Sequence, residues 1–235
     1  MPDTATPIEN RLLAALPADI YQHLLPHLEK IKLELRQVLY EAGDAINYVY
    51  FPNNALLSLV LKMRNGNSAE VGMVGNEGMV GTSAFMGGET MPYQVIVQGS
   101  DGAMKMTAAV LREEFNRGGL LQTLLLRYTQ ALHIQVSQTA ACNRLHSLDE
   151  RLARWLLMTH DRLQSERLEL TQEFLSTMLG VERSGVTLAA ITLQDEGLIK
   201  YSRGRITVLD RAGLERVSCE CYERVKLSFD ELLKA

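Results

Sequence analysis

The hydrophobic residues between positions 170 and 209 follow a helical period at first and a strand-like alternation afterwards. Six of them can be gathered on one side of two crossed helices: Phe174, Met178, Val181, Val186, Ala190 and Leu193. After Gly197, apolar and polar residues alternate in 198–201 and 206–209 around the turn-forming residues Ser202, Arg203, Gly204 and Arg205. The pattern predicts two helices joined by a tight turn and followed by a β-hairpin, which is the layout of a winged helix-turn-helix.

The ends of the first predicted helix are marked by residues that favour capping positions. Thr171 suits the N-cap, and Glu173 falls in the first turn, where the helix dipole favours a carboxylate. Gly180 can take the left-handed conformation that ends a helix, because it has no Cβ. We therefore expect the first helix to lie between Thr171 and Gly180, and the second to open at Glu182 to Ser184.

The second helix and the hairpin carry side chains that suit contact with DNA. Arg183, on the leading turn, can pair with the O6 and N7 acceptors of guanine, and Leu188 can touch a thymine methyl. Arg203 and Arg205 flank the hairpin glycine and can reach phosphates, which adds affinity that falls with salt. Weaker polar contacts are expected from four further residues: Thr171, Gln172, Ser184 and Thr187.

The alternative interpretation of this segment is a simple packing unit, because motif matches carry false positives. Total charge does not decide between the two, since residues 171–209 hold four acidic and four basic side chains. Their arrangement favours DNA binding: three of the basic residues lie in the predicted hairpin and the fourth is Arg183.

The first half of the chain has a different pattern. Residues 8–36 read as short helices interrupted by Pro17 and Pro26, and from Gln37 to Met106 short apolar runs alternate with Gly, Asn, Asp and Pro clusters. Many short strands at near-regular spacing predict a sandwich or jelly roll. Glycines recur at 72, 75, 78 and 81; turns and close backbone approaches explain them, and a phosphate-cradling loop is the alternative.

A long helix is predicted from Leu120 to about Ser147, where the sequence has no proline or glycine. Seven residues in it follow alternating steps of four and three, as in a coiled-coil seam: Leu121, Leu125, Tyr128, Leu132, Gln135, Thr139 and Cys142. A long core helix is the alternative. The seam turns polar in its second half, which favours a two-fold dimer contact, and we take these seven residues as the dimer interface.

Composition places the 235-residue chain among well-packed proteins, since 46% of its residues are hydrophobic. Residues 1–115 carry a net charge of −5 and residues 116–235 a net charge of +1, so the acidic excess lies away from the predicted DNA-binding end. No segment has the roughly 20 apolar residues of a membrane helix, and the N-terminus lacks a signal-peptide pattern. We expect a cytoplasmic protein that does not contact a membrane.

The 170–209 segment resembles the DNA-binding domain of the Crp/Fnr family of bacterial transcription regulators. The resemblance extends to Gly75–Gly88, which is similar to the family's effector-domain signature, and to the stretch from Asn143, which is similar to its passage out of the dimer helix. It implies an α+β fold with three parts: a β-roll effector domain at 1–116, a dimerisation helix at 117–147 and a winged helix-turn-helix domain at 148–235. Family members usually place a glutamate and a second arginine at the positions of Ser184 and Leu188, so the operator should depart from the family's usual sequence.

The resemblance also allows this sequence to be compared with family members that bind cyclic nucleotides. Members that bind cyclic nucleotides have a glycine and glutamate at the positions of Gly81 and Thr82, and an arginine with serine or threonine near Tyr93 and Gln94. No arginine occurs here between Arg64 and Arg112, and a buried phosphate without a cation is costly. We expect an effector other than cyclic AMP, or none, and no resident cofactor. The expected effector pocket comprises Gly81, Thr82, Tyr93, Gln94, Val136 and Ser137, the last two by the family alignment.

The three cysteines are expected to be ordinary buried or surface residues. Oxygen-sensing members of the family bind an iron cluster through N-terminal cysteines, whereas the first cysteine here is Cys142. Cys219 and Cys221 add too few thiolates for a four-ligand cluster in one chain, so no metal site is predicted. An oxidation-sensing role for Cys142 near the two-fold axis is the alternative.

Other classes of protein fit less well. A jelly-roll metalloenzyme needs histidines on its barrel strands, whereas all five histidines lie outside the predicted barrel, and no catalytic motif is present. A ligand-binding or redox-sensing module without DNA contact would leave the C-terminal motif unused. We therefore predict a homodimeric, non-enzymatic regulator that binds double-stranded DNA at an inverted repeat, with RNA polymerase as a partner if it activates transcription.

Overall fold

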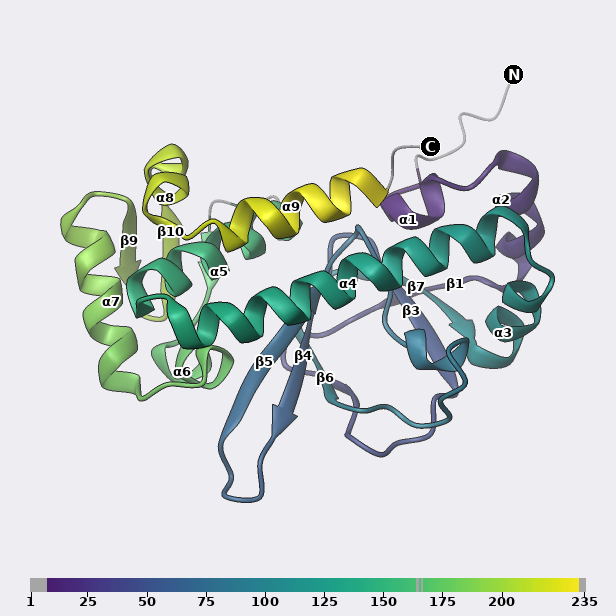
Figure 1. Ribbon diagram of the computed structural model, residues 1–235, viewed down its shortest axis with the longest axis horizontal. Helices are drawn as coiled ribbons and strands as arrows, with labels where there is room; N and C mark the ends of the chain where they lie inside the picture. The colour runs from purple at the N-terminus through teal and green to yellow at the C-terminus, as the bar shows by residue number, and fades with distance from the viewer. Residues whose placement is uncertain (1–7, 164, 166, 233–235) are drawn as a thin grey trace.

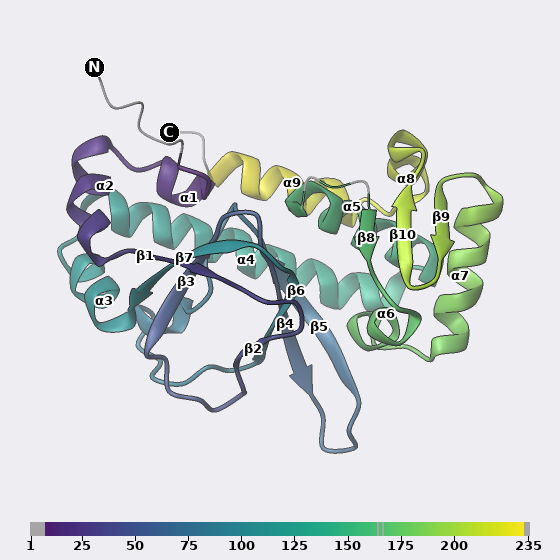
Figure 2. The same ribbon diagram turned by 180° about the vertical axis from the view of Figure 1, so that it is seen from behind.

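The computed structural model describes residues 8–163, 165 and 167–232. A β-roll lies at one end of the molecule and a smaller helix-rich unit at the other, and a long helix runs across both (Figures 1 and 2). This is the α+β architecture that the sequence predicts: a β-roll, a long helix and a winged helix-turn-helix.

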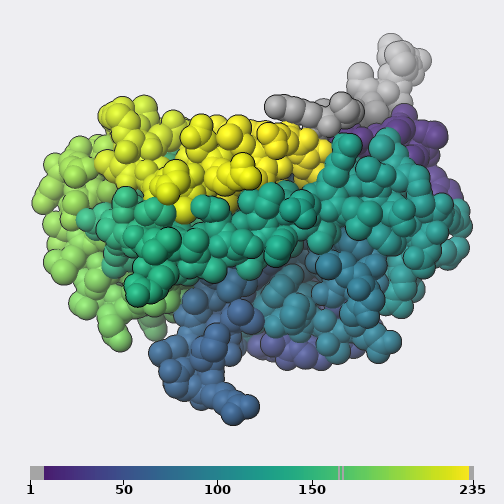
Figure 3. All heavy atoms as spheres, in the orientation of Figure 1, coloured from purple at the N-terminus to yellow at the C-terminus, as the bar shows by residue number. Residues whose placement is uncertain are grey.

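The β-roll consists of two antiparallel sheets. One has the strand order β1-β7-β3 and the other the order β2-β6-β4-β5. The strands are β1 (Glu29–Lys32), β2 (Val38–Tyr40), β3 (Tyr48–Pro52), β4 (Leu56–Lys62), β5 (Ser68–Val74), β6 (Gln94–Gly99) and β7 (Gly102–Thr107). The prediction of helices throughout 8–36 is wrong at β1, because this strand is set by its pairing with the distant β7. The first five residues of β4 are all buried, since this strand lies between β6 and β5 in its sheet and contacts α5. The β4–β5 hairpin projects beyond the roll (Figure 3).

Short helices close the β-roll at the end that is far from the helix-rich unit. They are α1 (Arg11–Ala14), α2 (Ala18–Leu24) and α3 (Ala108–Asn116). The side chain of Asn10 anchors this region, because it caps α1 at Leu13 and donates from Nδ2 to the carbonyl oxygens of Pro52 (2.7 Å) and Gly78 (3.0 Å).

The long helix is α4 (Gly119–Leu145), which has 27 residues. Its inward face packs on β5 and on α9, and the Tyr128 hydroxyl donates to Met79 O at 2.8 Å. The seven seam residues assigned to a dimer interface all lie on this inward face and are at most 8% exposed: Leu121, Leu125, Tyr128, Leu132, Gln135, Thr139 and Cys142. The prediction that they form a dimer interface is therefore wrong. They bury against their own chain, which is the long-core-helix alternative.

The helix-rich unit begins with α5 (Leu148–Leu163), which carries Trp155 into the core. It continues with α6 (Gln172–Leu179), α7 (Arg183–Asp195) and a three-stranded sheet of order β8-β10-β9, made of β8 (Arg167–Glu169), β9 (Ile199–Ser202) and β10 (Arg205–Val208). Strand β8 was not expected from the sequence, because it has only three residues and its single buried side chain, Leu168, gives no periodic signal.

Two helices complete the chain, α8 (Arg211–Val217) and α9 (Cys221–Leu232). Helix α9 turns back and runs alongside α4 toward the N-terminal helices (Figures 1 and 3). Its Phe229 ring lies 6.2 Å from the Tyr128 ring, and its Asp230 pairs with Arg11 of α1 at 3.3 Å. The C-terminal segment thus ties the helix-rich unit to the β-roll, and the expected domain boundaries at residues 116 and 147 stay a prediction. No helix within the described ranges combines the length and hydropathy needed to cross a bilayer.

Candidate DNA-binding site

The angle between α6 and α7 is set by local capping, as the sequence predicts. Thr171 caps α6 by accepting from the Phe174 N–H at 3.1 Å. Gly180 has φ +64°, and the N–H groups of Gly180 and Val181 donate to Thr177 O (3.3 Å) and Ser176 O (3.0 Å). These two bonds satisfy carbonyls at the end of α6 and reverse the chain. Helix α7 can then leave at a sharp angle.

Helix α7 buries one side and presents the other to solvent. Its buried side chains are Val186, Ala189, Ala190 and Leu193, three of which the sequence assigns to the core. Arg183 and Ser184 are exposed, and so is Leu188, at 66%. Ile191, which is 47% exposed one turn further along, extends this apolar stripe and was not identified from the sequence, although its position three residues after Leu188 was the available signal.

Thr187 has a more structural role than expected. Its hydroxyl donates to Arg183 O at 3.0 Å, one turn back along α7. The side chain is half-buried, and a hydroxyl hydrogen engaged in this way leaves only an oxygen lone pair for a base or phosphate.

A hollow of about 510 Å³ separates the start of α6, the start of α7 and the hairpin that connects β9 and β10. Its lining residues are Thr171, Gln172, Glu173, Arg183, Tyr201, Ser202, Arg203 and Gly204. The structure therefore brings together four of the residues selected from the sequence. Arg183 Nε donates to Gln172 Oε1 at 3.3 Å, which holds the guanidinium over the hollow. Tyr201, whose pKa is raised by burial, was missed because it stands at an ordinary strand position.

The β9–β10 hairpin, or wing, turns through two left-handed residues, Arg203 (φ +50°) and Gly204 (φ +76°). The two wing arginines are not equivalent. Arg205 Nε lies 3.7 Å from Glu169 Oε1 of β8, in an exposed pair, whereas Arg203 has no carboxylate partner among the described residues. Of the two wing arginines, Arg203 therefore has the positive charge that is less neutralised by a neighbouring carboxylate.

The β-roll contacts this unit directly. The β4–β5 hairpin lies beside the α6–α7 turn, where a Cβ on Gly180 would stand 3.0 Å from the Cβ of Ala69. A second hollow, of about 600 Å³, is lined by residues of both parts, including Asn67, Ser68, Thr177 and Glu182. A change in the position of the β4–β5 hairpin would therefore alter its contact with the turn that orients α7.

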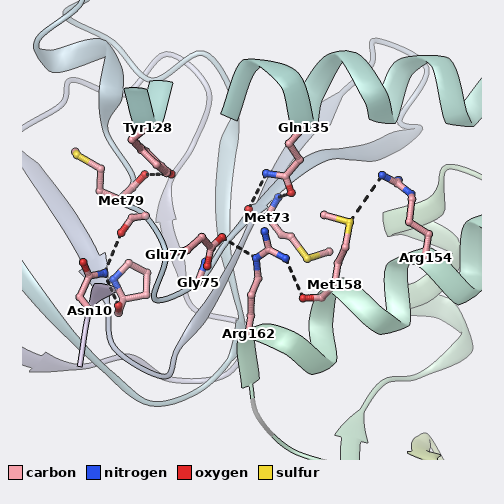
Figure 4. Close-up of polar contacts among 12 residues, drawn as sticks. Asn10, Met73, Gly75, Glu77, Met79, Tyr128, Gln135, Arg154, Met158 and Arg162 are labelled. Atoms are coloured by element: carbon pink, nitrogen blue, oxygen red, sulfur yellow. Dashed lines mark hydrogen bonds and ion pairs between the residues drawn. The ribbon is translucent and has the colours of Figure 1, made fainter. Parts of the chain in front are cut away.

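Buried polar contacts connect the glycine-rich loop and β5 to α4 and α5 (Figure 4). Arg162 Nε donates to Glu77 Oε1 at 2.7 Å, Gln135 Nε2 donates to Met73 O at 3.0 Å, and Trp155 Nε1 donates to Glu70 Oε1 at 2.9 Å. A Cβ on Gly78 would stand 2.2 Å from the Tyr128 ring, and one on Gly75 would stand 2.8 Å from Arg162. Gly75 and Gly78 thus allow the loop to approach α5 and α4 closely, which is the interpretation of close backbone approaches made from the sequence.

Comparison with known proteins matches two family models in the order that the fold suggests. The cyclic nucleotide-binding domain matches residues 30–117, and the Crp-like helix-turn-helix domain matches residues 150–217. The chain belongs to the Crp/Fnr family. It is a transcription regulator with an effector-binding domain and a helix-turn-helix DNA-binding domain, and members of this family are regulators and not enzymes.

Solved structures share the fold of this Crp/Fnr member at low sequence identity. FixK2 from Bradyrhizobium japonicum is 13% identical, with a TM-score of 0.67 over 82% of this chain and 98% of that one. A putative regulator of the family from Eubacterium rectale is 19% identical, with a TM-score of 0.67 over 88% and 96%. The c-di-GMP-responsive regulator CLP from Xanthomonas campestris is 14% identical, with a TM-score of 0.67 over 82% and 99%. No curated protein matches the sequence.

The effector pocket proposed for this Crp/Fnr member is only partly assembled in the structure. Gly81 and Thr82 are buried, and a hydrogen bond from Thr82 opposes the burial that raises the pKa of Tyr93. Gln94, in contrast, donates to Glu41 at 2.7 Å. On α4, Val136 packs beside Gly72, whereas Ser137 is exposed on the outward face. The grouping of all six residues stays a prediction.

The cysteines of this Crp/Fnr member are gathered at one point, which the sequence did not indicate. Cys142 and His146 at the end of α4 meet Cys219 and Cys221 at the start of α9, and their four ligand atoms lie within 4.8 Å of one another. All three thiols are buried and free. The hydrogen bond between Cys142 and Cys219 lowers the pKa of Cys142 and raises that of Cys219.

Proposed function

We propose that the protein is a homodimeric, sequence-specific regulator that reads an inverted repeat in double-stranded DNA. The observation that supports this proposal most directly is the exposed stripe of Arg183, Ser184 and Leu188 on α7, which the wing arginines flank. A guanidinium on the leading turn suits guanine, and an apolar stripe behind it suits thymine methyl groups. The wing arginines supply phosphate contacts that position the helix in the groove.

The dimer is proposed through the outward face of α4 in place of the inward seam. Side chains on this face also recur in steps of three and four: Thr123, Leu126, Gln130, His133, Ser137, Ala140 and Arg144. Leu126 is 51% exposed, and the small residues toward the end of the helix permit close approach of a second copy. Two-fold pairing of α4 would set two α7 helices in successive major grooves, about 34 Å apart.

The controlling signal is proposed to act on the β-roll and to differ from cyclic AMP. The positions that would hold the phosphate lie near Tyr93 and Gln94, and the sequence has no arginine between Arg64 and Arg112 to compensate an anion there. A signal that moved the β4–β5 hairpin would reach the α6–α7 turn through the contact between Ala69 and Gly180. RNA polymerase is a partner only if the outcome is activation.

Selection of binding sites from random duplexes tests this proposal. We expect the full chain to enrich an inverted repeat and Arg183→Ala to lose preference at one symmetric base pair, at a cost of about 1–3 kcal/mol for the matched site. Arg224→Ala, which removes an exposed arginine on α9, is the control and should keep the wild-type preference. Failure to enrich any sequence would contradict DNA reading; an unchanged preference in Arg183→Ala would remove the role given to that residue.

A further inference from the structure

The cluster of Cys142, His146, Cys219 and Cys221 has the geometry of a metal site. Cys142 Sγ lies 3.5 Å from Cys219 Sγ, and Cys221 Sγ lies 3.6 Å from His146 Nδ1. Tetrahedral zinc with bonds of about 2.3 Å to sulfur and about 2.0 Å to nitrogen would place neighbouring sulfurs about 3.8 Å apart, and sulfur and nitrogen about 3.5 Å apart. These two separations are close to the edges of such a tetrahedron, and the four ligand atoms all lie within 4.8 Å of one another.

Neighbouring groups support the four residues as ligands. His146 Nε2 lies 3.3 Å from Glu220 Oε2, so Nδ1 is left to bind a metal while the carboxylate holds the other ring nitrogen. This carboxylate–histidine arrangement is the usual support of a metal-bound imidazole. Gln138 Nε2 donates to Cys221 Sγ at 3.3 Å, as an amide does to a thiolate.

The positive charge beside the cluster also favours an anion there. Arg151 and Arg154 of α5 are buried, pair with no carboxylate among the described residues, and each has an Nε atom without a hydrogen-bond partner there. Both interact electrostatically with Cys142. Three thiolates around a divalent cation carry a net charge of −1, which would offset part of this buried positive charge, whereas three neutral thiols would offset none.

We propose that Cys142, His146, Cys219 and Cys221 bind one Zn²⁺ ion, in contrast to the absence of a metal site expected from the sequence. On binding, the three thiols lose their protons to solvent and the imidazole binds in its neutral form. The ion would fasten the start of α9 to the end of α4, at the junction where α5 leads into the DNA-binding unit. It is a structural site, because all four ligands come from the protein and no position is left open.

Two other fates of the thiols are distinguishable from this one. Cys142 and Cys219 could form a disulfide, which would need their sulfurs to close from 3.5 Å to about 2.05 Å. An iron–sulfur cluster would need some of its ligand atoms farther apart, because they are divided between at least two irons, whereas these four ligand atoms lie within 4.8 Å.

Metal analysis of the full chain, purified with a reductant and without a chelator, tests the proposal. We expect about one equivalent of zinc per chain. After removal of the metal, one equivalent of Co²⁺ should give the near-ultraviolet thiolate band and the visible bands of tetrahedral cobalt, with release of protons. The metal-loaded chain should also unfold at a higher temperature than the apo chain.

Variants locate the site. Cys221→Ser and His146→Ala should remove the tetrahedral cobalt spectrum, and Glu220→Gln should lower metal affinity about 10–100-fold. His27→Ala and Glu223→Gln, which alter an exposed histidine and an exposed glutamate outside the cluster, should leave both unchanged. Glu220 is also exposed, so its variant remains informative if those with altered buried cysteines fail to fold.

Three results would overturn the assignment: absence of bound zinc together with no cobalt spectrum, a Cys142–Cys219 disulfide in the purified chain, or iron with acid-labile sulfide. None of these readouts involves DNA, so the outcome is independent of the proposed function.

Discussion

Arg162 Nε donates to Glu77 Oε1 at 2.7 Å, and the two side chains are only 8% and 5% exposed. Glu77 belongs to the glycine-rich loop of the β-roll, whereas Arg162 belongs to α5. The same guanidinium donates from Nη1 to Met158 O at 3.0 Å and lies 5.6 Å from the Phe229 ring of α9. One buried ion pair thus joins the effector-binding part to the helices that carry the DNA-binding unit.

Removal of one partner of this pair should be costly. Glu77→Ala leaves a buried guanidinium without its carboxylate, and we expect the free energy of unfolding to fall by about 3–5 kcal/mol. Urea unfolding followed by circular dichroism measures it. Glu113→Ala breaks an exposed pair with Arg117 at a similar distance of 3.0 Å and should cost less than about 1 kcal/mol. Equal losses in the two variants would contradict the coupling role of Arg162.

Glu70 should make stability depend on pH. Burial raises its pKa from 4.5 to about 7, although hydrogen bonds with Ser58 and Trp155 oppose the shift, and its Oε2 has no partner among the described residues. The folded state therefore binds a proton more tightly than the unfolded state does. The stabilisation is fully present below pH 4.5 and is lost as the pH rises through about 7.

Glu70→Gln separates this group from the other titrating side chains. Because an amide mimics the protonated acid, the variant should unfold at a higher temperature than wild type at pH 8 and at nearly the same temperature at pH 4.5. The shift in the pKa corresponds to about 3 kcal/mol. Parallel stability profiles for the two proteins across this range would rule out the role given to Glu70.

Gly78 should not tolerate a side chain. A Cβ at this position would stand 2.2 Å from the Tyr128 ring, which is fully buried and cannot move aside, so Gly78→Ala should cost about 1–3 kcal/mol. Gly72→Ala is the control, because its nearest neighbour would be at 3.5 Å, an ordinary contact distance. Thermal unfolding compares the two, and a stable Gly78→Ala variant would contradict the packing of the loop against α4.

The wing arginines should differ in their effect on DNA affinity. Arg203→Ala removes a cation with no described carboxylate partner, and we expect it to weaken binding to all sequences and to lower the salt slope of log K by about 0.9. Arg205→Ala also releases Glu169 from its ion pair, which places an uncompensated carboxylate near the phosphates. Titrations at several salt concentrations measure both slopes. A change of base preference in Arg203→Ala would contradict its assignment to phosphate.

Dimerisation should depend on the outward face of α4. Leu126→Glu places a charge in the proposed two-fold contact and should yield monomers in sedimentation equilibrium, with weakened binding to an inverted repeat. Leu227→Glu on α9 changes a leucine of similar exposure, 45% against 51%, outside this face and should remain dimeric. A dimeric Leu126→Glu variant would exclude the outward face as the contact.

Local features of the DNA-binding unit were predictable because each depends on residues close in sequence. Thr171 caps the helix that begins at the next residue, and Gly180 ends it with a left-handed conformation that glycine adopts without strain. The wing turn follows from Arg203 and Gly204 in the same way. The exposed stripe of α7 follows from the helical period alone.

The orientation of α4 and the meeting of the cysteines could not be read from the sequence. The seam from Leu121 to Cys142 has the spacing of a dimer helix, but the same spacing serves a helix that packs on its own β-roll and on α9. Cys142 and Cys219 are 77 residues apart, and only the return of α9 along α4 brings them within 3.5 Å. The two helices and the hairpin of the DNA-binding unit, their ends and the exposed residues of α7 were predictable, because these depend on short-range backbone preferences. The tertiary structure alone decided which face of α4 is buried, which carboxylate Arg162 meets and where the thiols gather, because those outcomes depend on packing between segments far apart in the chain.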